Sequence, residues 1–141
     1  MEAFVTGPSA VLVPPQNYNV TLHSFRTVRM FKAPKLELVF RIVSYGDAFG
    51  KTVSRYYNVD AIIGKPQARG RFKVSRNRDF TREYYTLFDY GGKRLDRLPM
   101  SLFEGVIIEA QVVTVKESRG AVIPKPLRYS KIAKLNRVVE C

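Results

Sequence analysis

The sequence predicts a mainly β protein with a single helix, and three observations support this. Residues 35–43 ("KLELVFRIV") alternate apolar and polar side chains over the length of a strand. Residues 105–116 ("GVIIEAQVVTVK") are rich in the β-branched side chains that strands favour. Phe80, Tyr84, Leu87 and Phe88 stand at i, i+4, i+7 and i+8, the spacing of one apolar helix face.

The expected strands follow one another along the chain with turn signals between them. They span residues 18–30, 35–43, 51–59, 105–116 and 128–139. The first contains a bulge near His23 and Ser24, where its apolar spacing slips. Pro34 separates the first strand from the second, because proline cannot donate to a ladder. Two glycines and an aspartate in residues 44–50 predict a hairpin connection to the third strand.

A connector without strand pattern, residues 60–78, leads to the helix. Asp79 is the expected N-cap, and Gly91 with Gly92 is the expected stop. Three strands, one helix and two strands is the order of the OB-fold, a partly open five-stranded barrel. We therefore expect a five-stranded OB-like antiparallel barrel with one helix between strands 3 and 4. An SH3-like barrel, or a small α+β sheet with one covering helix, would give nearly the same pattern.

The length of the chain, 141 residues, fits a single domain preceded by an arm. Residues 1–16 hold Gly7 and three prolines, so we expect a flexible N-terminal arm whose apolar "AVLV" adds an edge strand or docks on a partner. Residues 17–141 then form one OB-like domain.

The charge of the chain is its least ordinary property. Twenty-four Lys and Arg stand against 12 Asp and Glu, giving +12 and a pI near 10.1. Such an excess is typical of proteins that bind nucleic acid, and also occurs in proteins that bind anionic membranes or acidic proteins. No apolar run approaches the roughly 20 residues that cross a bilayer, and the first residues lack the basic flank of a signal peptide. We expect a cytoplasmic protein with no membrane partner.

The stretch "GDAFGKTVSRYYNV" (46–59) interleaves rings and cations on the expected third strand. In an OB-type barrel the second and third strands form an exposed face, where rings stack on bases and cations neutralise phosphates. By alternation, one of the two adjacent tyrosines faces inward, and strands favour aromatic residues in any case. The candidates here are Tyr45, Phe49, Lys51, Arg55, Tyr56 and Tyr57.

Two further groups of cations lie in expected loops. Residues 65–78 carry six cations and no acid, so they repel one another unless an anion is bound, although a solvated basic loop is the alternative. These candidates are Lys65, Arg69, Arg71, Phe72, Lys73, Arg76 and Arg78. The loop between the last two strands adds Lys116, Arg119, Lys125 and Arg128, and the first turn carries Arg29, Lys32 and Lys35. In OB-folds the first and last of these loops border the ligand groove, so the sequence predicts basic clusters gathered on one face.

No motif in the chain indicates catalysis. The sole histidine, His23, has no evident partner for nucleophilic chemistry, and "GDAFGK" lacks the spacing of a phosphate-binding P-loop. No run has metal-ligand spacing, and the only cysteine is Cys141. We therefore expect neither an enzyme nor a metal or cofactor site. The alternative is a nuclease, which would require carboxylates distant in sequence to converge on a divalent ion in the fold.

Four blocks carry a resemblance to a known group of proteins: "SRYYNVDAIIGKP", "GRFKVSRNRDFTREYYTLFD", "RLDRLPMSLFEGVII" and "YSKIAKL". They resemble small, mostly uncharacterised proteins of bacterial plasmids, prophages and other mobile elements, over about residues 25–135. The hairpin "VFRIV…G…G…YYNV" is similar, more loosely, to that of phage-type single-stranded DNA-binding proteins with an OB-fold.

These observations favour a non-catalytic, sequence-tolerant single-stranded DNA-binding protein, acting in replication, recombination or transfer of a mobile element. The alternative is a protein-interaction module, an inhibitor or adaptor, whose basic face meets an acidic protein. RNA is a further ligand for the same surface, and the arm or an open sheet edge offers a route to a homodimer.

Overall fold

The alternating residues 35–43 form most of β2 (Ala33–Ile42), a central strand of the sheet. The computed structural model describes residues 11–89, 98–118 and 120–140. Leu36, Leu38 and Phe40 are fully buried on one face of β2, as their alternation predicts. The other elements are β1 (Gln16–Met30), β3 (Thr52–Asn58), β4 (Ala61–Ile63), β5 (Arg71–Lys73), α1 (Asp79–Phe88), η3 (Met100–Phe103), β6 (Ile107–Val115), β7 (Glu117–Ser118), β8 (Ala121–Val122), η4 (Lys125–Leu127) and β9 (Tyr129–Glu140).

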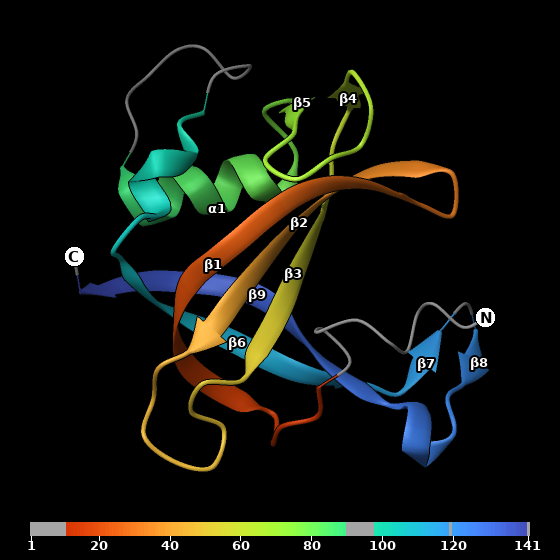
Figure 1. Cartoon of the computed structure of the whole chain (residues 1–141), viewed down its shortest axis with the longest axis vertical. Helices are drawn as coiled ribbons and strands as arrows, with labels where there is room; N and C mark the ends of the chain where they lie inside the picture. The colour runs from red at the N-terminus through yellow and green to blue at the C-terminus, as the bar shows by residue number, and fades with distance from the viewer. Residues whose placement is uncertain (1–10, 90–97, 119, 141) are drawn as a thin grey trace.

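β1 is a long strand that takes part in two ladders (Figure 1). Its residues 20–30 pair antiparallel with β2, and its residues 16–20 pair antiparallel with β6. The register against β2 shifts between Leu22 and Ser24, which is the bulge expected near His23 and Ser24. A bulge bends a strand and increases its twist, so β1 can leave one neighbour and join the other.

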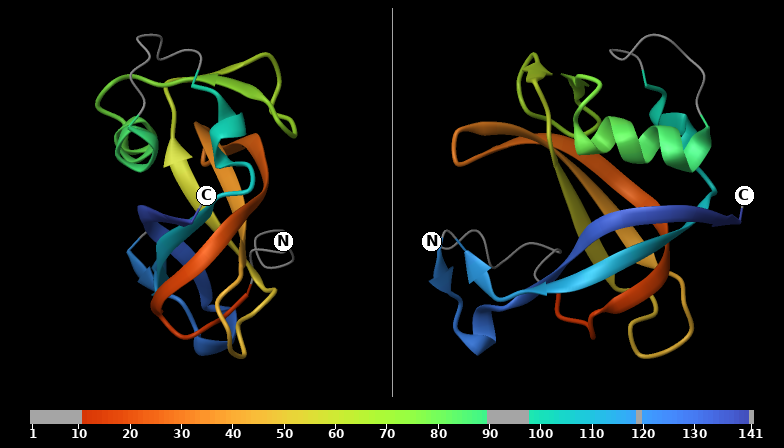
Figure 2. Two further views of the ribbon diagram at one scale, coloured as in Figure 1. Left: turned by 90° about the vertical axis from the view of Figure 1, so that its left-hand side faces the viewer. Right: turned by 180° about the vertical axis from the view of Figure 1, so that it is seen from behind.

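The five long strands form one antiparallel sheet in the order β3-β2-β1-β6-β9. Its edge strands, β3 and β9, lie close to each other without forming a ladder. The sheet is therefore strongly curved, as Figure 2 shows from two further sides, but its described strands form no closed barrel. Over the described ranges, the prediction of a mainly β fold with one α-helix and a five-stranded antiparallel sheet is confirmed.

The position of the helix differs from the prediction. Residues 60–78, expected as a loop, contain the hairpin of β4 and β5, in which Ile62 is buried opposite Phe72. The helix α1 consequently follows strand 5 and does not lie between strands 3 and 4. Within the five-stranded sheet, the hairpin and the helix both come between β3 and β6 in chain order.

The two ends of α1 also differ from expectation. Asp79 is the first helical residue, and the N-cap is Arg78, which makes no side-chain capping bond. At the other end, Asp89 adopts a left-handed conformation (φ 47°) and donates its N–H to the carbonyl of Tyr85. The helix thus ends before Gly91 and Gly92, which lie outside the described residues.

The apolar face of α1 closes the core at one end of the sheet. Phe80 and Tyr84 are buried, as their spacing predicts, and Phe80 meets the ring of Tyr57 edge-on at 5.0 Å. Tyr84 packs against Phe103 of η3 with 6.0 Å between ring centroids. The helix contacts both β3 and β9, and so covers the place where the two sheet edges approach.

Part of the expected N-terminal arm is attached to the domain. The N–H of Ser130 donates to the carbonyl of Val11 at 2.7 Å, and the N–H of Val13 donates to Ser130 Oγ at 2.8 Å. Val13 is buried in the core. The described end of the apolar "AVLV" stretch therefore docks on the edge of β9, while residues 1–10 lie outside the described residues.

Candidate functional site

The inward face of β3 holds an aromatic ring and a cation that were expected on the surface. Tyr57 is 2% exposed, so it cannot stack on a base, and that part of the prediction is wrong. The alternation explains its burial, because Tyr57 shares its face with the buried Val53 and Val59. Arg55 lies on the same face, with its guanidinium 4.2 Å from the centroid of the Tyr57 ring.

Both side chains belong to a buried network centred on Glu83 of α1. Arg55 Nη2 lies 2.5 Å from Glu83 Oε2, and the Tyr57 hydroxyl donates to Glu83 Oε1 at 2.8 Å. The backbone N–H of Leu135 in β9 donates to the same Oε1 at 3.0 Å. Burial raises the pKa of Tyr57 well above its ordinary value, and the negative charge of Glu83 raises it further. Glu83 therefore ties both sheet edges to the helix.

A surface groove of about 400 Å³ lies beside this network, between α1 and β9. The groove carries charges of both signs, with Asp79 and Arg82 on the helix and Lys134 on the strand. Its walls are completed by Arg55, Glu83, Thr86, Ala133, Leu135 and Asn136. Because Glu83 and Arg55 already bind each other there, the groove presents no concentrated charge of one sign.

The outer face of β3 contributes to a second polar network, which is centred on Glu37. Glu37 of β2 is 3% exposed, and its carboxylate accepts from Arg26 Nε at 2.6 Å and from the Ser54 hydroxyl at 2.7 Å. Tyr56 lies opposite Glu37 in the ladder and is half-buried. Of the two adjacent tyrosines, Tyr56 is the one on the outer face.

The exposed rings of the β2–β3 loop lie away from these groups. Tyr45 is fully exposed and Phe49 is 61% exposed, while Ala48 between them is buried and anchors the loop. Lys51 is exposed where the loop rejoins β3. The loop follows the C-terminal end of β2, so it lies at the opposite end of that strand from the β1–β2 turn (Figure 1).

A basic surface forms where the β1–β2 turn meets the β4–β5 segment, and we call residues 29–35 and 61–76 together the basic end. The backbone joins the two segments to β1 and β2. The N–H of Thr27 donates to the carbonyl of Gln67 at 3.0 Å, and the N–H of Arg69 donates to that of Phe25 at 2.9 Å. The N–H of Val59, just before β4, donates to the carbonyl of Pro34 at 3.3 Å.

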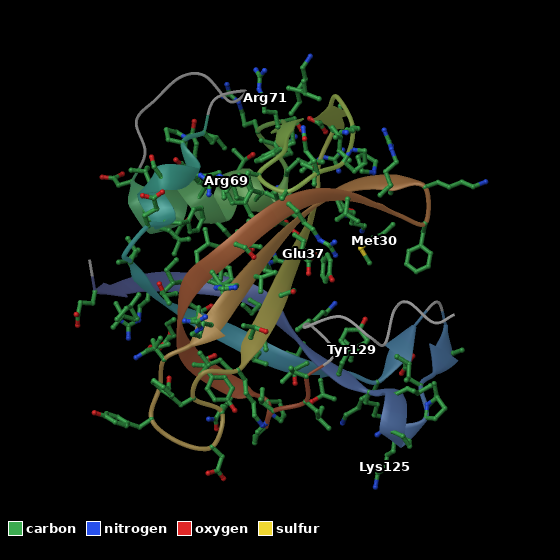
Figure 3. All side chains as sticks on the ribbon, viewed as in Figure 1. Met30, Glu37, Arg69, Arg71, Lys125 and Tyr129 are labelled. Carbon is green, nitrogen blue, oxygen red and sulfur yellow. The ribbon has the colours of Figure 1, made fainter. Side chains whose placement is uncertain are left out.

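The basic end contains cations and no acid. Its cations are Arg29, Lys32, Lys35, Lys65, Arg69, Arg71, Lys73 and Arg76. The nearest acid in sequence, Asp60, is bound to Arg78, with 2.6 Å between Oδ1 and Nη2. The predicted charge of the connector is thus presented on a folded hairpin, with Arg69 and Arg71 visible at this end in Figure 3.

The predicted stacking role of Phe72 is not supported by its position. Phe72 is half-buried and meets Phe80 edge-on, with 5.6 Å between ring centroids. It anchors the β4–β5 hairpin to α1. The exposed ring at this end is Phe31 of the β1–β2 turn, which is 68% exposed. Phe31 is not among the predicted residues, although the sequence places it in the first turn, with Arg29 and Lys32 on either side.

The last expected basic cluster lies elsewhere. Lys116, Lys125 and Arg128 belong to the segment around β7, β8 and η4, and Arg119 lies outside the described residues. Arg71 and Lys125 stand at opposite ends of the molecule in Figure 3. Because β6 runs antiparallel to β1, its C-terminal end lies where β1 begins, which carries this loop away from the β1–β2 turn. The structure does not gather all predicted clusters on one face.

The described residues contain no group of three or more His, Cys, Asp and Glu side chains placed to hold a metal ion. In the same part of the chain, no helix combines the length and apolar character that crossing a bilayer requires.

Comparison with known proteins adds no relative. Neither the family models, nor the curated proteins, nor the solved structures contain a match to this chain.

Proposed function

We propose that this protein is a non-catalytic, sequence-tolerant single-stranded DNA-binding protein that contacts its ligand through the basic end. The observation that carries the proposal is the charge of that surface. Two segments distant in sequence, residues 29–35 and 61–76, lie at the same end of the sheet, carry only positive charges, and expose the ring of Phe31.

The physical basis is neutralisation of phosphates by these cations. Cations crowded together without acids repel one another, and a bound polyanion relieves that repulsion while condensed counterions leave the nucleic acid. The flat face of every base can stack on an aromatic ring, so a contact of this kind tolerates any sequence. Arg71 and Lys73 are both exposed on β5, so their charges are accessible to a phosphate backbone.

The arrangement of the sheet supports an OB-like fold for this role. Three strands, β1 to β3, are followed by the β4–β5 hairpin, by α1 and by β6 and β9, and the edges β3 and β9 approach each other without forming a ladder. Many proteins with this arrangement bind oligonucleotides beside the first strand turn. In the cell, we propose the context that the sequence resemblance implies: replication, recombination or transfer of a mobile element in the bacterial cytoplasm.

The test is a fluorescence-anisotropy titration of the whole chain with a labelled oligo-dT of about 16 nucleotides, the upper size of a site on one OB domain. We expect binding at low salt. The logarithm of the association constant should fall linearly with the logarithm of the salt concentration, and each phosphate contact should add about 0.7 to the steepness of that line. Parallel titrations with a mixed-sequence DNA strand, oligo-U and duplex DNA compare the affinity for these ligands with that for oligo-dT. Absence of binding at low salt, or binding insensitive to salt, would overturn the proposal.

A further inference from the structure

The loop between β4 and β5, residues 64–70, is fastened to the side of β1 by hydrogen bonds. The N–H of Thr27 donates to the carbonyl of Gln67 at 3.0 Å, and the N–H of Gln67 donates to Thr27 Oγ1 at 3.0 Å. Two residues further along, the N–H of Arg69 donates to the carbonyl of Phe25 at 2.9 Å. The backbone of Arg69 therefore has a fixed place against β1.

Arg69 occupies the third position of a tight turn. The N–H of Gly70 donates to the carbonyl of Gln67 at 3.1 Å, which closes the turn over four residues. The φ of Arg69 is 54°, and a positive φ at this position favours glycine or asparagine. Arginine adopts this conformation at a cost in free energy, and the turn directs its side chain across β1 toward Phe25.

The guanidinium of Arg69 lies over the ring of Phe25. Its Cζ is 5.3 Å from the ring centroid, within the distance at which a cation and an aromatic face attract each other. Phe25 is 8% exposed and belongs to the core, so its ring is a rigid support. Arg69 itself is exposed. Arg69 is thus a surface cation whose orientation is set before any ligand binds.

The contact with Phe25 holds Arg69 without neutralising it. The neighbouring Arg26 is held differently, by the carboxylate of Glu37 at 2.6 Å. A carboxylate offsets the charge of its arginine, whereas a phenyl ring carries no net charge. Residues 61–76 also contain no acid. The charge of Arg69 is therefore available to an anionic ligand at the basic end.

A guanidinium that is already held suits a phosphate group for two physical reasons. Its N–H groups form a rigid fork that can donate to two phosphate oxygens at once, whereas the ammonium of lysine acts as a point charge. Ordering a long side chain on binding also costs free energy, and an arginine already in place avoids much of that cost.

We propose that Arg69 is the phosphate-binding residue that the basic end orients in advance, and that Phe25 is the positioning residue that holds it. This inference rests on the proposed function. Phosphates repeat along a strand whatever its bases, so a contact of this kind fits a sequence-tolerant protein. Among the cations of the basic end, Arg69 should depend most on being an arginine.

The first test exchanges the guanidinium for an ammonium in the full chain. Arg69→Lys keeps the charge but loses the fork, so we expect oligo-dT to bind about fivefold more weakly. The salt slope should stay unchanged, because the number of neutralised phosphates is the same. The matched control is Arg82→Lys, which makes the same exchange at an exposed arginine of α1, outside the basic end, and should bind as tightly as the unmodified protein.

The second test asks whether Phe25 acts through Arg69. Phe25→Leu keeps an apolar residue in the core but removes the ring face, and should weaken oligo-dT binding about threefold. Arg69→Asn removes the guanidinium and suits the turn. Added to Arg69→Asn, Phe25→Leu should cause no further loss, because the two residues act on one contact. Circular dichroism checks that each variant is folded at the temperature of the titration.

Three results would overturn the inference and leave the proposed function to the cations as a group. Arg69→Lys binds as tightly as the unmodified protein, or Arg82→Lys loses as much affinity as Arg69→Lys, or Phe25→Leu causes the same loss with and without Arg69. Where Phe25→Leu does not fold, the comparison of Arg69→Lys with Arg82→Lys decides alone. If the unmodified protein binds no oligonucleotide at low salt, the proposed function and this inference fail together.

Discussion

The hydroxyl of Tyr57 donates a hydrogen bond to Glu83 Oε1 at 2.8 Å, deep in the interior. The same carboxylate oxygen accepts from the backbone N–H of Leu135 in β9, and Arg55 binds the other oxygen. β3 and β9 form no ladder with each other. A side chain of the helix therefore satisfies polar groups of both sheet edges at the point where pairing between the edges is missing.

Glu83→Gln should strongly destabilise the protein. The substitution leaves the guanidinium of Arg55, whose side chain is 12% exposed, without its counter-charge. Removing one partner of a buried ion pair costs about 3–5 kcal/mol, and we expect a loss of that order in the free energy of unfolding measured with urea. The control is Glu109→Gln, whose partner Arg137 is 64% exposed; an exposed pair of this kind contributes about 0–1 kcal/mol. Similar losses in the two variants would contradict the role of Glu83.

Stability should fall as the pH rises above about 10, the ordinary pKa of tyrosine. Burial and the charge of Glu83 raise the pKa of Tyr57 in the folded state, so above pH 10 the folded chain holds a proton that the unfolded chain has lost. The stabilisation is complete below the unfolded pKa and is lost as pH rises toward the folded one. The free energy of unfolding, measured with urea from pH 9 to 11, should fall with pH, and this fall should be less steep in Tyr57→Phe.

The slope should be reduced in that variant and not abolished, because burial also raises the pKa of Tyr18. Tyr45→Phe is the control, since it removes a hydroxyl from a fully exposed ring. A variant at Tyr57 with the full slope of the unmodified protein would show that its proton is not linked to folding.

Gly70→Ala should loosen the basic end from β1. A Cβ on Gly70 would lie 2.2 Å from Thr27 Oγ1 and 2.9 Å from the carbonyl oxygen of Gln67. Those atoms also make the bonds that hold this segment, since Gln67 N–H donates to Thr27 Oγ1 at 3.0 Å. Overpacking of this kind costs about 1–3 kcal/mol. Hydrogen exchange should show faster opening at Gln67 and Arg69, while the exposed Ala68→Ser should change neither stability nor exchange.

The sequence was sufficient where a long stretch repeats one pattern. The alternation of residues 35–43 predicted β2 and its buried face, and the spacing of Phe80 and Tyr84 predicted α1. The burial of Tyr57 was also readable, because Val53 and Val59 share its face. Weighing that face against the neighbouring cations would have removed Tyr57 and Arg55 from the candidate surface.

Other features depend on contacts that no local pattern contains. β4 and β5 are three residues each, too short for a period, and they form because Ile62 and Phe72 find apolar surface. Glu83 reads as one polar residue of an amphipathic helix until the sheet edges are placed beside it. The separation of Lys125 from Arg71 follows from the direction of β6, which is a property of the whole sheet.

That separation gives a test of which end contacts nucleic acid. Arg71→Ala should flatten the salt dependence of oligo-dT binding by about 0.7, the contribution of one phosphate contact to a single strand. Lys125→Ala removes the same charge from the opposite end of the molecule and should leave the slope unchanged. Both substitutions lower the net charge of +12 by one, so a general effect of charge would appear equally in both. Anisotropy titrations at four or more salt concentrations measure the slopes. A flatter slope for Lys125→Ala than for Arg71→Ala would move the contact surface to the segment around η4, away from the β1–β2 turn.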